Sequence, residues 1–72
     1  MSNFINQGAV KVIELIGISN KSYDDAVAQA VEKASESVNG ITGVEVLKFS
    51  ARVADGKITQ YRASVKLAFA VK

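Results

Sequence analysis

A single stretch of this 72-residue chain, residues 22–40, has the periodicity of a helix, and it constrains the fold more than any other feature. Its apolar residues recur at the spacing of one helical face: Tyr23, Val27, Ala30, Val31, Ala34 and Val38. Ser22 is the predicted N-cap, and Asp24 and Asp25 place negative charge at the positive end of the helix dipole. The pair Asn39-Gly40 is the predicted stop signal. We therefore predict one helix, whose thin face of alanine and valine allows a close approach to a sheet.

The rest of the chain has the pattern of three strands. Residues 9–19 are β-branched and apolar, and Gly17 within them marks a bend or a close backbone approach. Asp55-Gly56 is typical of a two-residue hairpin turn, so the segments on either side of it are predicted to pair. The predicted partners across this hairpin include Phe49 with Arg62, Glu45 with Lys66, and Gly43 with Ala68. We predict an α+β fold of order β-α-β-β, in which a three-stranded antiparallel sheet, last strand central, curls around a single helix.

Both faces of the predicted hairpin are apolar. The face that covers the helix comprises Val44, Val46, Tyr61, Ala63, Val65, Leu67, Phe69 and Val71. The opposite face comprises Leu47, Phe49, Ala51, Val53 and Ile58, beside Arg62 and Ser64. Lys48 falls on the helix side in this register, and a bulge between Leu47 and Phe49 would re-aim it.

The surplus of apolar residues predicts self-association. Hydrophobic residues make up 49% of the chain, which is more than one helix and a small sheet can hide on one side. The chain has no cysteine, so no disulfide can stabilise so small a core. Apolar patches of several hundred Å² mark interaction sites. We therefore predict that the chain forms a homo-oligomer. Each copy is predicted to have one domain, residues 9–72, preceded by a flexible arm, residues 1–8. In the alternative, this arm docks on a neighbouring copy through Phe4 and Ile5.

No enzyme is predicted. Without histidine or cysteine the chain cannot form a Ser–His or Cys–His pair, and it has no glycine-rich phosphate loop. The net charge is only +2 and the basic residues are dispersed, so no nucleic-acid partner is expected. No apolar stretch approaches the ~20 residues that span a bilayer, and no signal peptide is evident. We expect a soluble, cytoplasmic protein without a membrane partner. Whether carboxylates of several subunits together bind a metal stays an open question.

Five motifs in order resemble one known family. They are VIELIGIS, which leads directly into SYDDAVAQAVEKA, then VEV, the ADGK turn and YRASVKLAFAV. Together they run from about Val10 to Val71 and resemble the dodecins, which are small flavin-binding proteins. The resemblance implies a β-α-β-β fold with the sheet curled around the helix. It also implies a hollow spherical homododecamer, in which the surplus apolar face would be buried.

The residues that the family uses for flavin differ here. In flavin-binding dodecins a Trp stacks on the ring system, and the matching position is Gly43; a Gln after the Tyr binds the polar edge of the ring, and the matching position is Arg62. The resemblance implies a flavin site at Gly43, Val44, Glu45 and Arg62. Glycine has no π-face, and aromatic stacking contributes about 0.5–1.5 kcal/mol beyond area burial. We therefore expect weakened or altered flavin binding, and arginine could instead stack or pair with an anion.

Several interpretations stay open. Gly43 could simply relieve crowding at a bend, Glu45 could pair with Lys66, and the stem of Arg62 could cover Phe49. At the level of function, the chain could bind and store or sequester flavin or another small planar ligand. It could instead form a dodecin-like shell that binds another small ligand or an ion. The third hypothesis is a purely structural assembly module.

Overall fold

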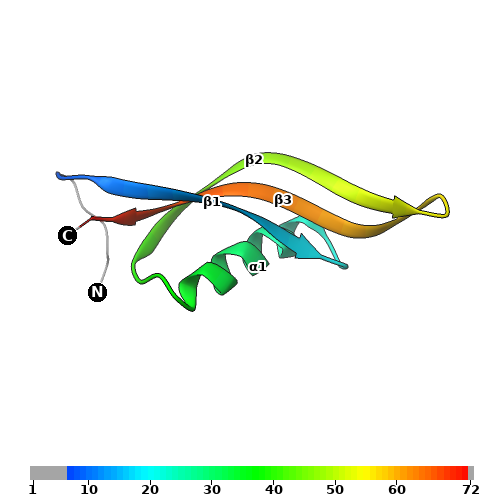
Figure 1. The fold of residues 1–72 in the computed structure, drawn as a ribbon, viewed down its shortest axis with the longest axis horizontal. Coiled ribbons are helices and arrows are strands. Elements are labelled where there is room, and N and C mark those ends of the chain that lie inside the picture. Colours follow the sequence, from blue (N-terminus) through cyan, green and yellow to red (C-terminus); the bar gives the residue numbers. More distant parts are fainter. Residues whose placement is uncertain (1–6, 72) are drawn as a thin grey trace.

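The computed structural model describes residues 7–71 and has the predicted β-α-β-β order. The elements are β1 Val10–Ser19, α1 Tyr23–Ser35, β2 Ile41–Ala54 and β3 Lys57–Ala70. The sheet is antiparallel throughout, with the order β1-β3-β2, so the last strand is central as expected. Figure 1 shows α1 against one face of the curved sheet, while the β2–β3 hairpin extends beyond the helix. The predicted arm at residues 1–8 lies almost wholly outside the described residues.

The helix begins where the sequence predicts and ends earlier. The Ser22 side chain accepts a hydrogen bond of 3.0 Å from the backbone N–H of Asp25, as an N-cap does. The last helical residue is Ser35, so Val38 lies beyond the helix rather than on its apolar face. Gly40 has a φ of +75°, a left-handed conformation that glycine adopts without a Cβ clash, and it leads the chain into β2.

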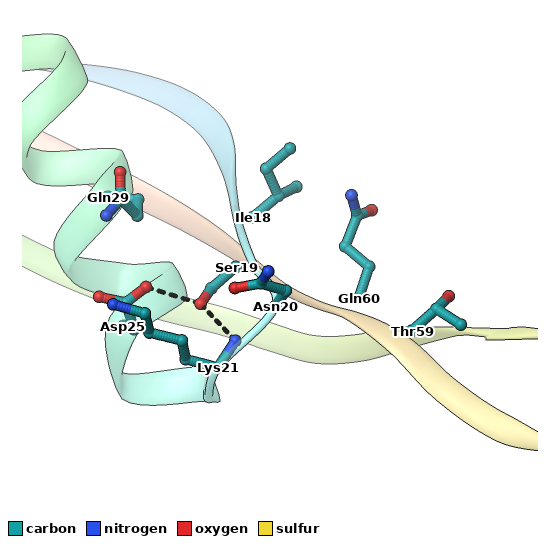
Figure 2. A pocket seen from close by; sticks show the side chains of 8 residues that line it. All are labelled: Ile18, Ser19, Asn20, Lys21, Asp25, Gln29, Thr59 and Gln60. Atoms are coloured by element: carbon teal, nitrogen blue, oxygen red, sulfur yellow. Dashed lines mark hydrogen bonds between the residues drawn. The ribbon is translucent and has the colours of Figure 1, made fainter.

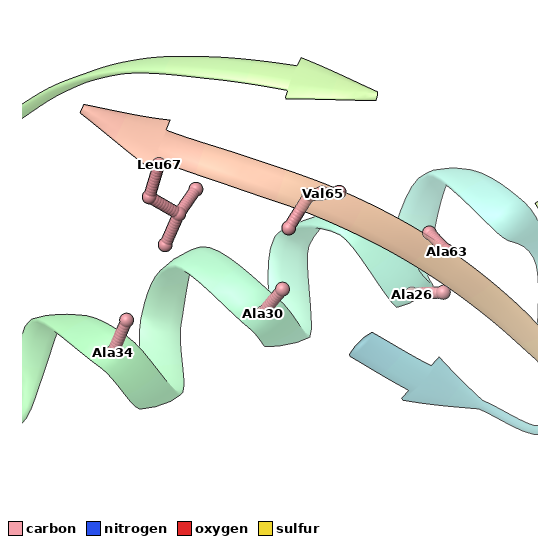
Figure 3. Packing of buried hydrophobic residues seen from close by; sticks show 6 residues of the cluster. All are labelled: Ala26, Ala30, Ala34, Ala63, Val65 and Leu67. Carbon is pink, nitrogen blue, oxygen red and sulfur yellow. The ribbon is translucent and has the colours of Figure 1, made fainter. Parts of the chain in front are cut away.

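Small side chains form the core between α1 and β3. The buried residues are Ala26, Ala30 and Ala34 on the helix and Ala63, Val65 and Leu67 on the strand. In Figure 3 the three alanines lie between the helix and β3, where they face the strand residues. The alanine ridge therefore contributes the fully buried part of the helix, and Val27 and Val31 flank it, half-buried.

The alanine ridge allows a close approach of helix and sheet at Gly17. A Cβ built on Gly17 would lie 1.9 Å from the carbonyl oxygen of Ala26 and 2.9 Å from the Cβ of Ala30. No real side chain tolerates the first distance, so only glycine fits on β1 at this point. The predicted close backbone approach is confirmed.

Three irregularities shift the hairpin register, and the third, between Ile41 and Gly43, lies at the far end of β2. Near the turn Ala54 pairs with Lys57 as expected, but one extra residue in β3, Thr59, precedes the next pair. One extra residue in β2, Leu47, then shifts the register back. The predicted pairs Glu45–Lys66 and Gly43–Ala68 are therefore correct, while the segment between the two shifts is displaced by one residue.

The displaced segment corrects the predicted faces. Phe49 pairs with Ala63, not with Arg62, and so lies on the helix side of the sheet. Its ring contacts that of Tyr23, with ring centroids 4.8 Å apart, and Tyr23 also meets Tyr61 at 4.9 Å. The prediction that placed Phe49, Ala51, Val53 and Ile58 on the opposite face is wrong, because a straight ladder was assumed. The bulge does re-aim Lys48, which pairs with Ser64 on the face away from the helix.

Candidate functional site

The face of the sheet away from α1, here called the outer face, has an apolar edge and a polar centre. The apolar edge is β1, where Val12, Ile16 and Ile18 are 47%, 59% and 50% exposed. The strand register places the centre and far side as follows: Arg62, Ser64, Lys66 and Ala68 on β3, and Gly43, Glu45, Lys48, Ser50 and Arg52 on β2. An exposed apolar surface opposite the helix is therefore present, but β1 forms more of it than the sequence predicted.

Gly43 lies in an open row of the outer face. Its neighbour on β3 is Ala68, whose other partner is Val12 on β1. A Cβ on Gly43 would meet the Ala68 Cβ at 3.6 Å, which is ordinary contact, and the φ of Gly43 is not positive. Neither crowding nor backbone conformation requires glycine here, so the interpretation that Gly43 relieves crowding is wrong.

A row of alternating charge follows. Lys66 on the central strand lies between Glu14 on β1 and Glu45 on β2. The register thus pairs Glu45 with Lys66 as predicted. Within residues 7–71, the ion pair closer than 4 Å is the exposed Lys33–Glu36 contact of 3.6 Å on the helix, so Lys66 makes no direct ion pair with Glu14 or Glu45.

Arg62 lies far from Gly43 along the sheet. Its partners are Ile18 on β1 and Ser50 on β2, and its Nε donates a hydrogen bond of 2.8 Å to Oε1 of Gln60. Six residues of β3 separate Arg62 from Ala68, the partner of Gly43, which is about 20 Å of strand. Phe49 lies on the opposite face, so the interpretation that Arg62 covers its ring is wrong.

The predicted site residues therefore do not form one pocket within a single chain. Gly43 and Glu45 occupy neighbouring rows of the outer face, and Arg62 lies at a distance from both. Val44 pairs with the buried Leu67, so its side chain faces the helix and only its backbone is available to the outer face. A site that uses all four residues requires more than one copy of the chain.

Sequence reasoning missed a polar cavity where β1 ends and α1 begins. It has a volume of about 320 Å³ and is lined by Ile18, Ser19, Asn20, Lys21, Asp25, Gln29, Thr59 and Gln60. The buried Ser19 hydroxyl donates a hydrogen bond of 2.6 Å to Oδ2 of Asp25 and accepts one of 2.9 Å from the Lys21 N–H (Figure 2). Asp25 was assigned only to the helix dipole. A serine on the inward-facing side of a strand end, six residues before an acid of the first helical turn, was the available signal.

The described residues carry no metal cluster of their own. Within residues 7–71, no three Asp, Glu, His or Cys side chains are grouped so as to hold an ion. No helix in the same range is long and apolar enough to cross a membrane.

Comparison with known proteins agrees on one family. The family model named Dodecin matches residues 9–72. The calcium dodecin of Mycobacterium tuberculosis is 38% identical over 63 residues, which cover 86% of this chain and 87% of that protein. Its crystal structure, described as a calcium-chelating antigen with a novel calcium-binding site, has a TM-score of 0.78 at 35% identity and covers 90% and 93% of the two chains. The dodecin of Streptomyces coelicolor superimposes with a TM-score of 0.89 at 26% identity, over 94% and 97%. This chain therefore belongs to the dodecin family.

Proposed function

We propose that this chain is a self-associating dodecin, a homododecamer in the cytoplasm, that binds and stores or sequesters a small ligand rather than catalysing a reaction. The observation that carries the proposal is the apolar edge of the outer face. Val12, Ile16 and Ile18 are about half exposed in a single chain, on the face of the sheet that lies away from α1. A second copy is the natural cover for such a surface in a chain too small for a larger core.

The ligand site proposed from the family resemblance is formed between copies. Gly43, the backbone of Val44, and Glu45 would come from one copy and Arg62 from another, since about 20 Å of strand separates Gly43 from Arg62 in one chain. Flavin bound there would have no aromatic ring to stack on at position 43. We therefore propose weak or altered flavin binding.

Native mass spectrometry combined with flavin fluorescence tests this function. We expect a dodecamer and only weak quenching of riboflavin fluorescence by the purified protein. Gly43→Trp is expected to tighten binding by at least about tenfold, because the space over Ala68 is open and stacking is restored. Gly43→Ala is the matched control, since it fills the position without adding an aromatic ring.

Two results would count against it. A folded monomer in dilute buffer would remove the self-association. Unchanged flavin affinity in the Gly43→Trp dodecamer would exclude a flavin site at this row. If the assembled protein bound neither flavin nor an ion, the remaining hypothesis would be a purely structural assembly module.

A second candidate ligand is a divalent cation. It is supported by the relationship to a calcium dodecin and by the oxygen-rich cavity at the start of α1. The carboxylate of Asp25, the hydroxyl of Ser19 and the amide oxygens of Asn20 and Gln29 are of the type that Ca²⁺ prefers. The ammonium of Lys21 lines the same cavity and opposes a cation there.

Calorimetric titration of Ca²⁺ into the assembled protein separates this candidate from the first. Asp25→Asn should weaken binding about tenfold, while Lys21→Gln should tighten it. Asp24→Asn removes the same charge from the exposed side of the same turn and should change little. Equal binding by all four proteins would place the ion elsewhere.

A further inference from the structure

The connection between α1 and β2 contains the pair Asn39-Gly40, which the candidate ligand sites do not use (Figure 1). It is the one place in the sequence where a glycine follows an asparagine. Asn39 is exposed, whereas Gly40 is half-buried, has a φ of +75° and leads directly into Ile41, the first residue of β2. The side-chain amide of Asn39 therefore lies in solvent beside a residue that has no side chain of its own.

No hydrogen bond to residues 7–71 holds either the side chain of Asn39 or the N–H of Gly40. The backbone bonds at the end of the helix stop just before this pair, where the N–H of Val38 donates to the carbonyl of Ala34 at 2.9 Å. A bonded N–H would have to give up its acceptor before its nitrogen could react. The nitrogen of Gly40 has no such acceptor to give up within the described residues.

Asn20, the other asparagine of the described residues, provides a comparison within the same chain. It is exposed as Asn39 is, but the residue that follows it differs in two respects. The N–H of Lys21 donates a hydrogen bond of 2.9 Å to the Ser19 hydroxyl, and Lys21 carries a side chain that crowds its own nitrogen. The backbone nitrogen after Asn20 is thus occupied and hindered, and the one after Asn39 is neither.

We propose that Asn39 is a site of spontaneous deamidation. The backbone nitrogen of Gly40 gives up its proton and attacks the side-chain carbonyl carbon, Cγ, of Asn39. The new N–Cγ bond closes a five-membered succinimide ring, the Cγ–Nδ2 bond breaks, and Nδ2 takes up the proton and leaves as ammonia. One water molecule then opens the ring at either carbonyl. The products at position 39 are aspartate and isoaspartate, each with one additional negative charge.

Isoaspartate at position 39 would disturb the start of β2. In this product the main chain runs through the former side chain, which adds one carbon atom to the backbone directly before Gly40. Ile41 packs against the buried core and pairs with Phe69 on the central strand, so the connection has a fixed end to reach. We expect the longer backbone to loosen the first pairs of β2, next to the register irregularity between Ile41 and Gly43.

Ageing of the assembled protein tests the site. The purified protein is kept at physiological temperature, and peptide mapping by mass spectrometry follows both asparagines. We expect Asn39 to convert at least about tenfold faster than Asn20, because its neighbouring nitrogen is unhindered and unbonded. An isoaspartate-specific methyltransferase identifies the isoaspartate product. Asn39→Gln is the matched variant, since it keeps the amide but needs a six-membered ring to react, and it should stay unmodified.

Hydrogen exchange tests the consequence for β2. The aged protein should exchange at least about tenfold faster at residues 41–44 than aged Asn39→Gln, which has the same history without the modification. Conversion of Asn39 no faster than that of Asn20 in the assembled protein overturns the proposed site. Rapid conversion of the same Asn39 after unfolding in urea would then show that the assembly protects it. Conversion with unchanged exchange overturns the effect on β2 and supports the site alone.

Discussion

The two faces of the sheet differ in how they are completed. The helix side buries Ala63, Val65 and Leu67 fully beneath a ridge of alanines, and one chain supplies every residue of that contact. The outer face leaves Ile16 and other aliphatic side chains of β1 half exposed beside unpaired charges. The part of the helix side that α1 covers thus specifies how a copy folds, whereas the outer face is available for other copies and for ligands. Substitutions matched across the two faces can break or sharpen this distinction.

The largest effect is expected from a methyl group on the helix side. Gly17→Ala should lower the free energy of unfolding by about 3 kcal/mol or more, because its Cβ would meet the backbone of Ala26 and push α1 from the sheet. Gly43→Ala on the outer face should change it by less than about 0.5 kcal/mol. Urea unfolding at one protomer concentration measures both. Similar losses in the two variants would contradict the distinction between the faces.

A charge on the outer face should act on association rather than on folding. Ile16→Asp is expected to weaken self-association at least tenfold, about 1.4 kcal/mol, since it places a carboxylate in the surface proposed to be buried. Light scattering over a dilution series reports the mass. Ala28→Asp, at an exposed helix position, is the control. Phe49→Asp, which the straight hairpin ladder would favour for this test, is unsuitable because Phe49 contacts Tyr23 on the helix side.

A smaller effect is expected at the start of the helix. Ser22→Ala removes the acceptor for the Asp25 N–H and should lower the free energy of unfolding by about 1 kcal/mol. Ser35→Ala, at the exposed last residue of α1, is the control. Thermal unfolding of the two variants under identical conditions compares them, and an unchanged midpoint for Ser22→Ala would show that the cap contributes little.

Most of the fold could be predicted because period and turn signals are local. The helical spacing after Ser22 and the Asp55-Gly56 turn were enough for the β-α-β-β order and the central last strand. The positions of the bulges could not be predicted. A single extra residue such as Thr59 loses one ladder hydrogen bond and adds curvature to the strand, and the sequence does not show which of these two effects is larger. The predicted face of Phe49 was wrong for this reason. Ala26 was not predicted to belong to the core, because its burial depends on the lack of a side chain at Gly17.

The candidate site was harder to predict than the fold. Gly43 and Glu45 were placed correctly on one face, because the two register shifts cancel before the hairpin reaches them. Arg62 was also placed correctly on this face, but about 20 Å of strand separates it from Ala68, the partner of Gly43, so a shared site requires several copies. The Ser19–Asp25 contact joins residues from a strand end and a helix start, and it depends on the path of the chain between them.

The extra residues at Leu47 and Thr59 leave the pairs from Val46–Val65 to Gly43–Ala68 in place, so they alter the bend of the hairpin and not the pairing of that segment. Removing Leu47 or Thr59 would therefore straighten the hairpin while preserving which side chains meet. In an assembly built through the outer face, that bend sets the tilt from each copy to the next. The number of subunits that closes a shell would then depend on single-residue insertions in two strands, and could change between relatives without any change at the contacts themselves.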